Sequence, residues 1–315
     1  MTAFLLRRTA GFLATVLIIS IIVFVVMNVL PGDPATAILG FDASEEAIAA
    51  LRAELGLDRP LVERYLDWAI SALRGDFGES YFFRVPVADL IAERLPLTLS
   101  LSALGILATV TLGVALGIIA AANHRRPGDW AIMLFSQTGI AVPAFWLSIL
   151  LVLLFAVQLR WLPPGGFPGW DEPGLALRSL ILPATALALV QAAVLARVTR
   201  SSALEVMGLD YIRTARAKGL SHGGVLRGHV LPNALIPVVT IVGLQVAGVV
   251  TGTIVIENVF YLPGLGRLAF QSIANRDLFV VQALVLFFAL VVVTANFIVD
   301  VAYVVIDPRL KDRLR

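Results

Sequence analysis

The sequence contains no cysteine, and it has only three histidines, His124, His222 and His229, in 315 residues. Without cysteine, neither a disulfide framework nor a thiolate metal site can form. The histidines are too few and too widely separated to build an imidazole metal site. The sequence therefore predicts no metal ligand and no resident cofactor in this chain.

Charged residues are also scarce. They form 15% of the chain, whereas hydrophobic residues form 59% and the mean hydropathy is +0.90. An ordinary soluble domain carries about 25% charged residues, and about 20 apolar residues cross a bilayer core as a helix. Six charge-free runs approach or exceed that length: 9–30, 95–123, 130–159, 179–196, 230–256 and 278–299. Because the runs are continuously apolar, they predict an all-α integral membrane protein with six transmembrane helices rather than a β-barrel.

The distribution of basic residues indicates an orientation. Arg7 and Arg8, the pair Arg125 and Arg126, the arginine-rich segment 197–227 and the chain end 309–315 all fall on one side of the predicted spans. Segment 31–96, on the other side, carries more acids than arginines. Basic residues in short loops favour the cytoplasm, so both termini are predicted to be cytoplasmic. A cleaved signal peptide at 9–30 is disfavoured, because its apolar run exceeds the usual ~7–15 residues.

The chain also lacks the residues that an enzyme would need. Its only lysines are Lys218 and Lys311, and neither lies in a Gly-rich phosphate-binding motif. No plausible set of serine, histidine and acid falls within a span. Asp300 is the only clear ionisable residue in the predicted spans, so proton coupling is an alternative to simple pairing at the interface. The sequence predicts a protein without catalytic residues, which neither hydrolyses ATP nor cleaves peptides unaided.

Three segments between the spans are predicted to lie on the extracytoplasmic side of the membrane. Segment 31–96 is predicted to hold three short helices, near 44–56, 60–75 and 87–95, the last leading into the second span. It either shields the helix ends or docks a soluble partner. Segment 161–178, rich in proline and glycine, is predicted to be an irregular loop. In segment 257–277 a PGLG turn precedes a short amphipathic helix, 267–274.

Uncharged polar residues within the spans have two possible roles. They hold helices together by hydrogen bonds, or they line a pathway for a polar solute. The predicted pathway-lining residues are Gln137, Thr240, Gln245 and Thr251. Two small-residue pairs, Gly113 with Gly117 and Gly248 with Gly252, predict close helix approach, and Pro143 predicts a kink in the third span.

The polar, arginine-rich loop 201–232 differs from the rest of the chain. A helix is predicted over 204–218, ended by Gly219, followed by a second segment 222–230 and by Pro232 at the start of the fifth span. An anchor on anionic lipid would account for its charge. It would not account for the small residues, which suit close approach of another protein's groove: Thr214, Ala215, Ala217 and Gly219.

This loop resembles the cytoplasmic coupling motif of ABC importer permeases, E-A-A-x3-G-x9-I-x-L-P. Ala215, Gly219, Leu231 and Pro232 are in register, while Arg213, Thr214 and His229 replace the Glu, the first Ala and the Ile. The variant YIRTARAKG is similar to the dipeptide, oligopeptide and nickel branch. Further similar motifs are LPGDP at 30–34, LGLDRPL at 55–61, RGDFGES at 74–80, ERLPLTL at 93–99, ENVFYLPGLGRL at 257–268 and IDPR at 306–309. The long segment 31–96 resembles that of the first of two permease subunits.

The resemblance implies a type I ABC importer transmembrane fold in a bacterial inner membrane. It implies three kinds of partner: a second permease subunit, two cytoplasmic ATPases that bind ATP and magnesium, and an extracytoplasmic substrate-binding protein. Peptides are the expected cargo. A nickel chelate, glutathione, an opine or an oligosaccharide is the alternative. An ion-coupled secondary transporter would need buried mid-membrane charges, which the sequence lacks.

The resemblance also implies an organisation of the chain. Residues 1–30 form the N-terminus and first span, 31–96 the extracytoplasmic segment, 97–305 a five-helix core that contains the coupling loop, and 306–315 a cytoplasmic tail. ATPase coupling is expected at Asp210, Tyr211, Arg213, Thr214, Ala215, Arg216, Ala217 and Gly219.

Overall fold

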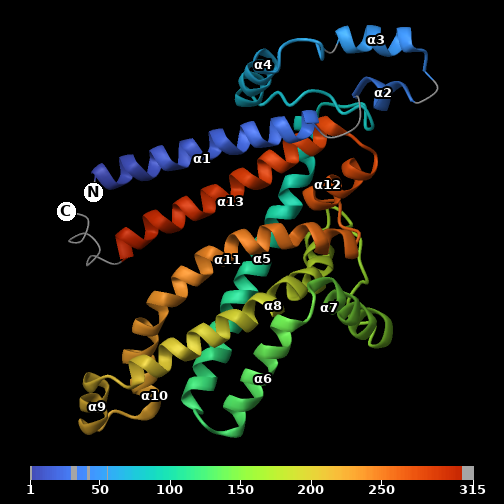
Figure 1. Ribbon diagram of the computed structural model, residues 1–315. Helices are drawn as coiled ribbons and strands as arrows, with labels where there is room; N and C mark the ends of the chain where they lie inside the picture. Colours follow the sequence, from blue (N-terminus) through green and yellow to red (C-terminus); the bar gives the residue numbers. More distant parts are fainter. Residues whose placement is uncertain (1, 30–33, 41–42, 55, 307–315) are drawn as a thin grey trace. The chain divides into compact units, whose positions relative to one another are not determined.

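The structure is a computed structural model that describes residues 2–29, 34–40, 43–54 and 56–306 (Figure 1). The described residues contain helices and no strand beyond one isolated bridge between Glu79 and Pro86. They form two compact units, one of 97–263 with 295–306 and one of 2–96 with 264–294. Most of the LPGDP motif, and the predicted tail from residue 307 onward, lie outside the described residues.

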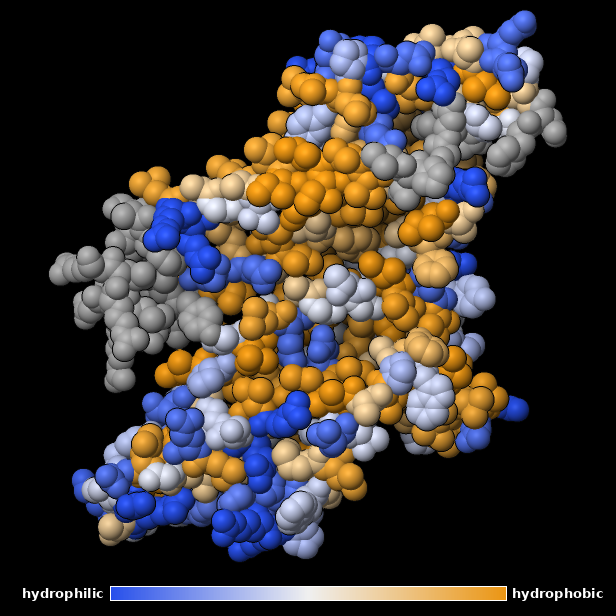
Figure 2. Space-filling model, in the orientation of Figure 1, coloured by the Kyte–Doolittle hydropathy of each residue, from blue (hydrophilic) through white to orange (hydrophobic). Residues whose placement is uncertain are grey.

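Five described helices are long and apolar enough to cross a bilayer. They are Leu6–Asn28 within α1 (Thr2–Val29), α5 (Val87–Ala122), α8 (Pro173–Met207), His222–Val259 ending with α11 (Leu231–Val259), and Leu278–Val301 within α13 (Leu278–Ile306). Each of them overlaps one of the six predicted runs, and only the run 130–159 has no single spanning helix. In Figure 2 the surface over the middle of α1 is largely hydrophobic, whereas the surface over α9 (Asp210–Ala217) and α10 (His222–Val225) is largely hydrophilic.

The predicted third span is not one helix. α6 (Pro127–Ala141) is followed by α7 (Ala144–Leu151) and the π-helix η1 (Val152–Gln158), with a bend of 111° at the break. Pro143 has no N–H to donate and disfavours helix at the residue before it, and Val142 is extended at φ −86°, ψ 126°. The predicted kink at Pro143 is confirmed. The count is therefore five spans, or six if the bent pair forms one.

In the unit of 97–263 with 295–306, α8 is the central helix. Added methyl groups on Gly113 and Gly117 of α5 would lie 2.7 Å from Leu195 Cβ and 2.5 Å from Thr199 Cβ, both on α8. Such close backbone approach is how membrane helices associate, because lipid supplies no hydrophobic drive between them. Small side chains at these positions therefore bring the helices together, as predicted.

The second small-residue pair brings α11 against the same central helix. A methyl group on Gly248 would lie 2.8 Å from Gln191 Nε2, and one on Gly252 3.1 Å from Leu187 Cδ2. The predicted close approach at Gly248 and Gly252 is confirmed. Neighbouring helices thus enclose α8, and 67% of the residues in its most apolar stretch are buried.

In the unit of 2–96 with 264–294, α4 (Leu61–Leu73) packs on α1. Tyr65 Oη lies 2.8 Å from Ser20 Oγ, and Arg64 donates to Asn28 Oδ1 at 2.5 Å. The helices predicted near 44–56 and 60–75 are confirmed as α3 (Glu45–Glu54) and α4. The third is wrong as a separate element, because Val87 begins the continuous helix α5, and α2 (Pro34–Leu39) was not predicted.

Two segments that are far apart in the sequence are joined in this unit. Ser80 Oγ donates to the buried Asp277 at 2.5 Å, and Tyr81 Oη accepts from Leu278 N at 2.6 Å and donates to Arg276 O at 3.1 Å. Burial raises the pKa of Tyr81 to about 12, so its hydroxyl stays protonated and keeps donating at neutral pH. The motif at 74–80 and the end of segment 257–277 therefore form one structure.

The predicted external segment 257–277 begins later than expected. α11 continues to Val259, and Glu257 is fully buried within it, accepting from Thr98 Oγ1 at 2.7 Å. A buried carboxylate is tolerated where hydrogen bonds satisfy it, so an acid did not end the helix here. The short helix predicted at 267–274 is confirmed as α12 (Leu265–Ala274).

Candidate coupling site

The loop that resembles the coupling motif folds around the short helix α9. Ile212 is fully buried and Ala215 is 8% exposed, three residues apart on one face. Residues three apart share a helix face, so these two side chains point into the protein. They join a buried cluster with Ala203 and Val206 of α8 and Val225 of α10. α9 is therefore anchored to the bundle by a small apolar contact.

The opposite face of α9 is exposed and carries most of the predicted coupling residues. Exposed members of that set are Asp210, Tyr211, Arg213, Thr214, Arg216, Ala217 and Gly219. Arg213 donates to Asp210 at 3.2 Å, but both side chains are well exposed, so the pair contributes little to stability. Asp210 in the first turn and Arg216 in the last turn both suit the helix dipole.

The side chain of Ala215 faces away from the surface on which a partner was predicted to dock. Together with Thr214 and Ala217 it was expected to suit a partner's groove, but its side chain faces the protein's own core. A larger residue here would press on α8 and α10 before it met any partner. Its smallness is explained by packing under α9.

The predicted helix over 204–218 is wrong as a single element. α8 ends at Met207, Leu209 is extended at φ −75°, ψ 149°, and α9 begins at Asp210. Gly208 N donates to Leu204 O and Glu205 O, which closes α8. The break makes α9 an independent eight-residue helix, free to take its own direction.

Gly219 ends α9 in a left-handed conformation, with φ +86°. Leu220 N donates to Ala215 O at 3.3 Å and Gly219 N donates to Arg216 O at 2.9 Å, which is the Schellman pattern. No other atom lies within 4 Å of where a Cβ would be. Glycine is therefore required by backbone geometry and not by crowding within this chain.

The return from α9 to the membrane follows the prediction. Ser221 caps α10, accepting from Gly224 N at 3.2 Å, and the π-helix η2 (Leu226–Val230) leads into α11. Pro232 lies in the first turn of α11, where a missing N–H does no harm. Ser202 Oγ of α8 donates to Ala234 O of α11 at 3.1 Å.

A charged clamp near this site was not predicted. Arg200 of α8 donates to the Asp129 carboxylate through Nε at 2.5 Å and Nη2 at 2.7 Å. Arg125 N also donates to Asp129 at 3.0 Å, and Asp129 is only 3% exposed. Bidentate geometry makes this one of the stronger polar contacts available to a protein. The sequence signal was an acid in the first turn of α6 and an arginine following a long apolar run.

The predicted pathway residues are distributed over two helices. Gln137 is exposed on α6, and Thr240, Gln245 and Thr251 lie on α11. Gln245 Nε2 donates to Gln191 O of α8 at 3.0 Å, which is a helix-joining contact. At roughly 100° per residue, Thr240 and Thr251 share a face from which Gln245 is turned by more than a quarter turn. Gln245 is thus separated from the other two.

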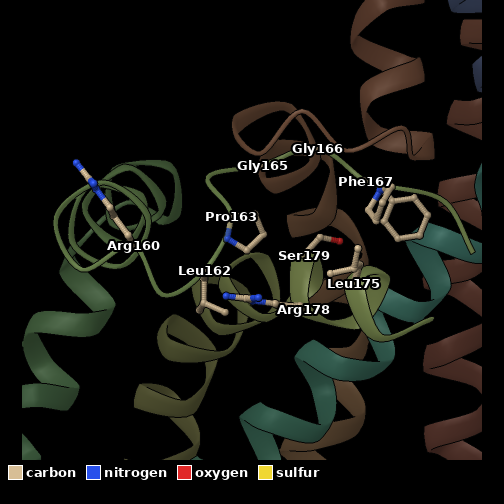
Figure 3. Close-up of a pocket in the computed structure, with 10 residues that line it drawn as sticks. Arg160, Leu162, Pro163, Gly165, Gly166, Phe167, Leu175, Arg178 and Ser179 are labelled. Carbon is tan, nitrogen blue, oxygen red and sulfur yellow. The ribbon is translucent and has the colours of Figure 1, made fainter. Parts of the chain in front are cut away.

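The proline-rich loop between η1 and α8 forms an open pocket of about 630 Å³ (Figure 3). It is lined by two arginines: Arg178 donates to Trp161 O at 2.6 Å, and Arg160 points away from the other labelled residues. Gly165 lies so close to the backbone of Phe260 that no side chain fits there. The predicted irregular loop is confirmed, and it packs against Phe260, the residue that follows α11.

The described residues define a polytopic helical membrane protein, and among them no group of three or more His, Asp or Glu residues could hold a metal ion. The chain belongs to the family of binding-protein-dependent transport system inner membrane components, whose model matches residues 113–312. The model of the N-terminal part of such components matches residues 1–102.

Relatives in this family cover the whole chain. A peptide transport system permease protein of Brucella abortus is 46% identical over 99% of both chains. The glutathione transport system permease protein of Escherichia coli is 43% identical over 99% of both. The chain is therefore a permease subunit of an ABC importer and a multi-pass protein of the inner membrane.

Solved structures support the fold. A methionine ABC transporter in an inward-facing conformation matches with a TM-score of 0.57 at 16% identity, covering 69% of this chain and 96% of that one. An amino acid ABC transporter matches with a TM-score of 0.50 at 17% identity, covering 68% and 93%. The matching helices therefore follow the type I ABC importer permease fold.

Proposed function

We propose that this subunit forms part of the translocation pathway for peptides or closely related small solutes. The observation that carries the proposal is the near-complete alignment with permeases named for peptide and glutathione transport, both of which are peptide cargoes. A second permease subunit completes the pathway, and a binding protein delivers the solute. Cargo selection then rests largely on the binding protein.

Uptake by the assembled transporter in proteoliposomes tests the cargo. With the cognate ATPases and binding protein present, we expect ATP-dependent accumulation of labelled short peptides. Omitting ATP or the binding protein should abolish accumulation, because neither energy nor delivery comes from this chain. Uptake driven by a proton gradient without ATP would contradict the proposal, and exclusive uptake of a nickel chelate or an oligosaccharide would contradict the cargo.

The proposed energy coupling runs through α9. Its exposed face, with Tyr211, Arg213 and Arg216, docks in a groove of the ATPase, while Ile212 and Ala215 hold the helix to α8 and α10. Closure of the ATPase pair on ATP then moves α9 and the helices behind it, a rigid-body alternation between inward- and outward-facing states. Arg213 stands where the motif has an acid, so its contact on the ATPase is expected to be acidic or a backbone carbonyl.

The proposed orientation places both termini and α9 in the cytoplasm. The positive charge of segment 197–227 and the net acidic segment 31–96 support this orientation. The joined structure of Ser80, Tyr81 and Asp277 then lies on the outer face, where we place the contact with the binding protein. The domain organisation follows: an outer segment 31–96, a core of 97–305 with its coupling loop, and a cytoplasmic tail from 306.

Single-cysteine cross-linking tests both contacts, because the native chain contains no cysteine. Arg213→Cys is expected to cross-link to the ATPase, and Ile212→Cys, one position away but buried, is the matched control that should not. Glu79→Cys, exposed beside Ser80, is expected to capture the binding protein. Capture of the binding protein from Arg213→Cys, or of the ATPase from Glu79→Cys, would reverse the orientation.

A further inference from the structure

Helix α4 uses only part of its apolar surface inside the chain. Tyr65 and Trp68 pack on Phe24 of α1, with ring centroids 5.5 and 5.7 Å apart. The neighbouring apolar side chains are exposed: Val62 by 70%, Leu66 by 51% and Leu73 by 88%. At roughly 100° per residue these three lie within about 40° of one another, beside the face that packs on α1. An unpaired apolar stripe therefore borders the α1 contact.

A crevice of about 250 Å³ lies between the two helices, next to this stripe. Ile21 and Val25 of α1 form one wall, and Leu61 and Val62 of α4 form the other. Nearly all of its lining surface is carbon. Two polar residues, Asn28 and Tyr65, also line it, but Asn28 already bonds to Phe24 O and Arg64, and Tyr65 to Ser20. A ligand that fits is therefore apolar and flexible, because burying a polar group against these walls would be unfavourable.

The position of α4 along α1 indicates whether its exposed apolar side chains lie in the bilayer or in water. The part of α1 able to cross the bilayer ends at Asn28, and Tyr65 contacts Ser20, eight residues earlier. Eight helical residues correspond to about 12 Å. α4 thus lies beside the final turns of the membrane-spanning part of α1, not beyond its end. At that depth an exposed apolar stripe meets hydrocarbon.

The residues of α1 beside the crevice argue against a protein neighbour. Residues 21–27 (IIVFVVM) contain no glycine, alanine or serine, and Ile22 and Val26 are about half exposed. Helix–helix interfaces in membranes are enriched in small residues, as at Gly113 and Gly117 in this chain. Branched aliphatic side chains in an unbroken run suit contact with acyl chains.

We propose that α4 lies in the interfacial layer of the bilayer and that an acyl chain of a phospholipid occupies the α1–α4 crevice. The polar side of α4 fits this position. Glu63 and Asp67 both pair with Arg59, at 3.3 and 2.7 Å, on the side that would face water and headgroups. An amphipathic helix with aromatic residues beside its apolar face binds in this layer. The inference depends on the membrane location of α1 and not on the cargo.

Spin labels on single cysteines test the position of α4 in the assembled transporter in lipid nanodiscs. Leu66→Cys places the label on the apolar stripe, and Glu63→Cys places the matched control on the polar side. We expect the label at 66 to collide with oxygen several-fold more than with a water-soluble nickel chelate, and the label at 63 to show the reverse. Three results would overturn the proposal: equal nickel access at both positions, exclusion of both probes at 66, as beneath another protein chain, or protection at 66 only when the binding protein is added.

Lipid retention tests the crevice itself. Val62→Trp should fill it, so native mass spectrometry is expected to show less phospholipid retained per complex than for wild type. Glu63→Trp adds the same bulk on the polar side and should leave retention unchanged. Equal retention in Val62→Trp and wild type would overturn the acyl-chain assignment, even if α4 lies in the interface.

Discussion

Replacing Gly219 with valine is expected to uncouple transport from ATP hydrolysis. Gly219 has φ +86°, and an L-residue in the left-handed region costs roughly 1–2 kcal/mol, more when it is β-branched. The strain would distort the Schellman closure of α9 and turn its exposed face. A change of this size shifts an equilibrium roughly 5- to 30-fold. Uptake and substrate-stimulated ATPase activity of the reconstituted transporter should fall by that order, while the amount of assembled complex stays close to wild type.

Gly223→Val is the matched control for this substitution. Gly223 also has open space around its Cβ position, but it lies in α10 with an ordinary φ. The Gly223→Val substitution adds the same side chain to the same loop without backbone strain, so transport should be retained. If Gly219→Val transports normally, or if Gly223→Val is equally impaired, the left-handed end of α9 is not what couples the two activities.

Replacing Asp129 with alanine is expected to destabilise the contact between the first turn of α6 and the C-terminal part of α8. Asp129 is 3% exposed and holds Arg200 through both carboxylate oxygens. Removing one partner of a buried pair leaves the other charge unpaired, which costs roughly 3–5 kcal/mol. Because the Arg200 side chain is 22% exposed, we expect the lower end of this range. Thermal unfolding of the purified complex should show a clearly lower midpoint, with reduced transport.

A double substitution and an exposed pair serve as controls. Asp129→Asn with Arg200→Gln removes both charges and should be less destabilising than Asp129→Ala, because no charge is left unpaired. Arg59→Gln breaks a pair of similar length, 2.7 Å to Asp67, whose side chains are half exposed, so it should change stability by less than about 1 kcal/mol. Equal destabilisation by Asp129→Ala and Arg59→Gln would contradict a clamp at Asp129.

Much of the fold could be predicted because bilayer crossing imposes a simple length rule. Five apolar runs overlap spanning helices, and the family motif located the loop around Ala215 and Gly219. The number of apolar residues needed to cross a bilayer does not show at which residue a helix ends. The breaks at Val142 and Leu209 depend on local backbone conformation, and α5 continues through Pro96 because a membrane helix tolerates proline.

The sequence predicted which residues make up the candidate site but not which way their side chains face. A motif gives the register of Ala215, yet only the packing of α8 and α10 shows that this side chain faces inward. The Asp129–Arg200 clamp joins residues 71 positions apart, and no local pattern reports such a pairing. Gln245 was equally ambiguous, since an amide in a span can face a neighbouring helix or a pathway, and here it donates to α8.

The enclosure of α8 has a consequence for how the protein is made. The most apolar stretch of α8 has a mean hydropathy of 2.0, the lowest among the five spans, whereas that of α1 is 2.9. The same stretch of α8 is nevertheless the most buried of the five. Transfer of α8 alone into lipid is therefore less favourable than transfer of α1. Contacts with the surrounding helices add to its stability in the membrane. α5 and α6 are synthesised before α8, so the glycine face of α5 and the carboxylate of Asp129 are already present when α8 leaves the ribosome. Two of the helices that pack on α8 can therefore contact it as soon as it enters the membrane, and α11 adds its contact at Gly248 and Gly252 later.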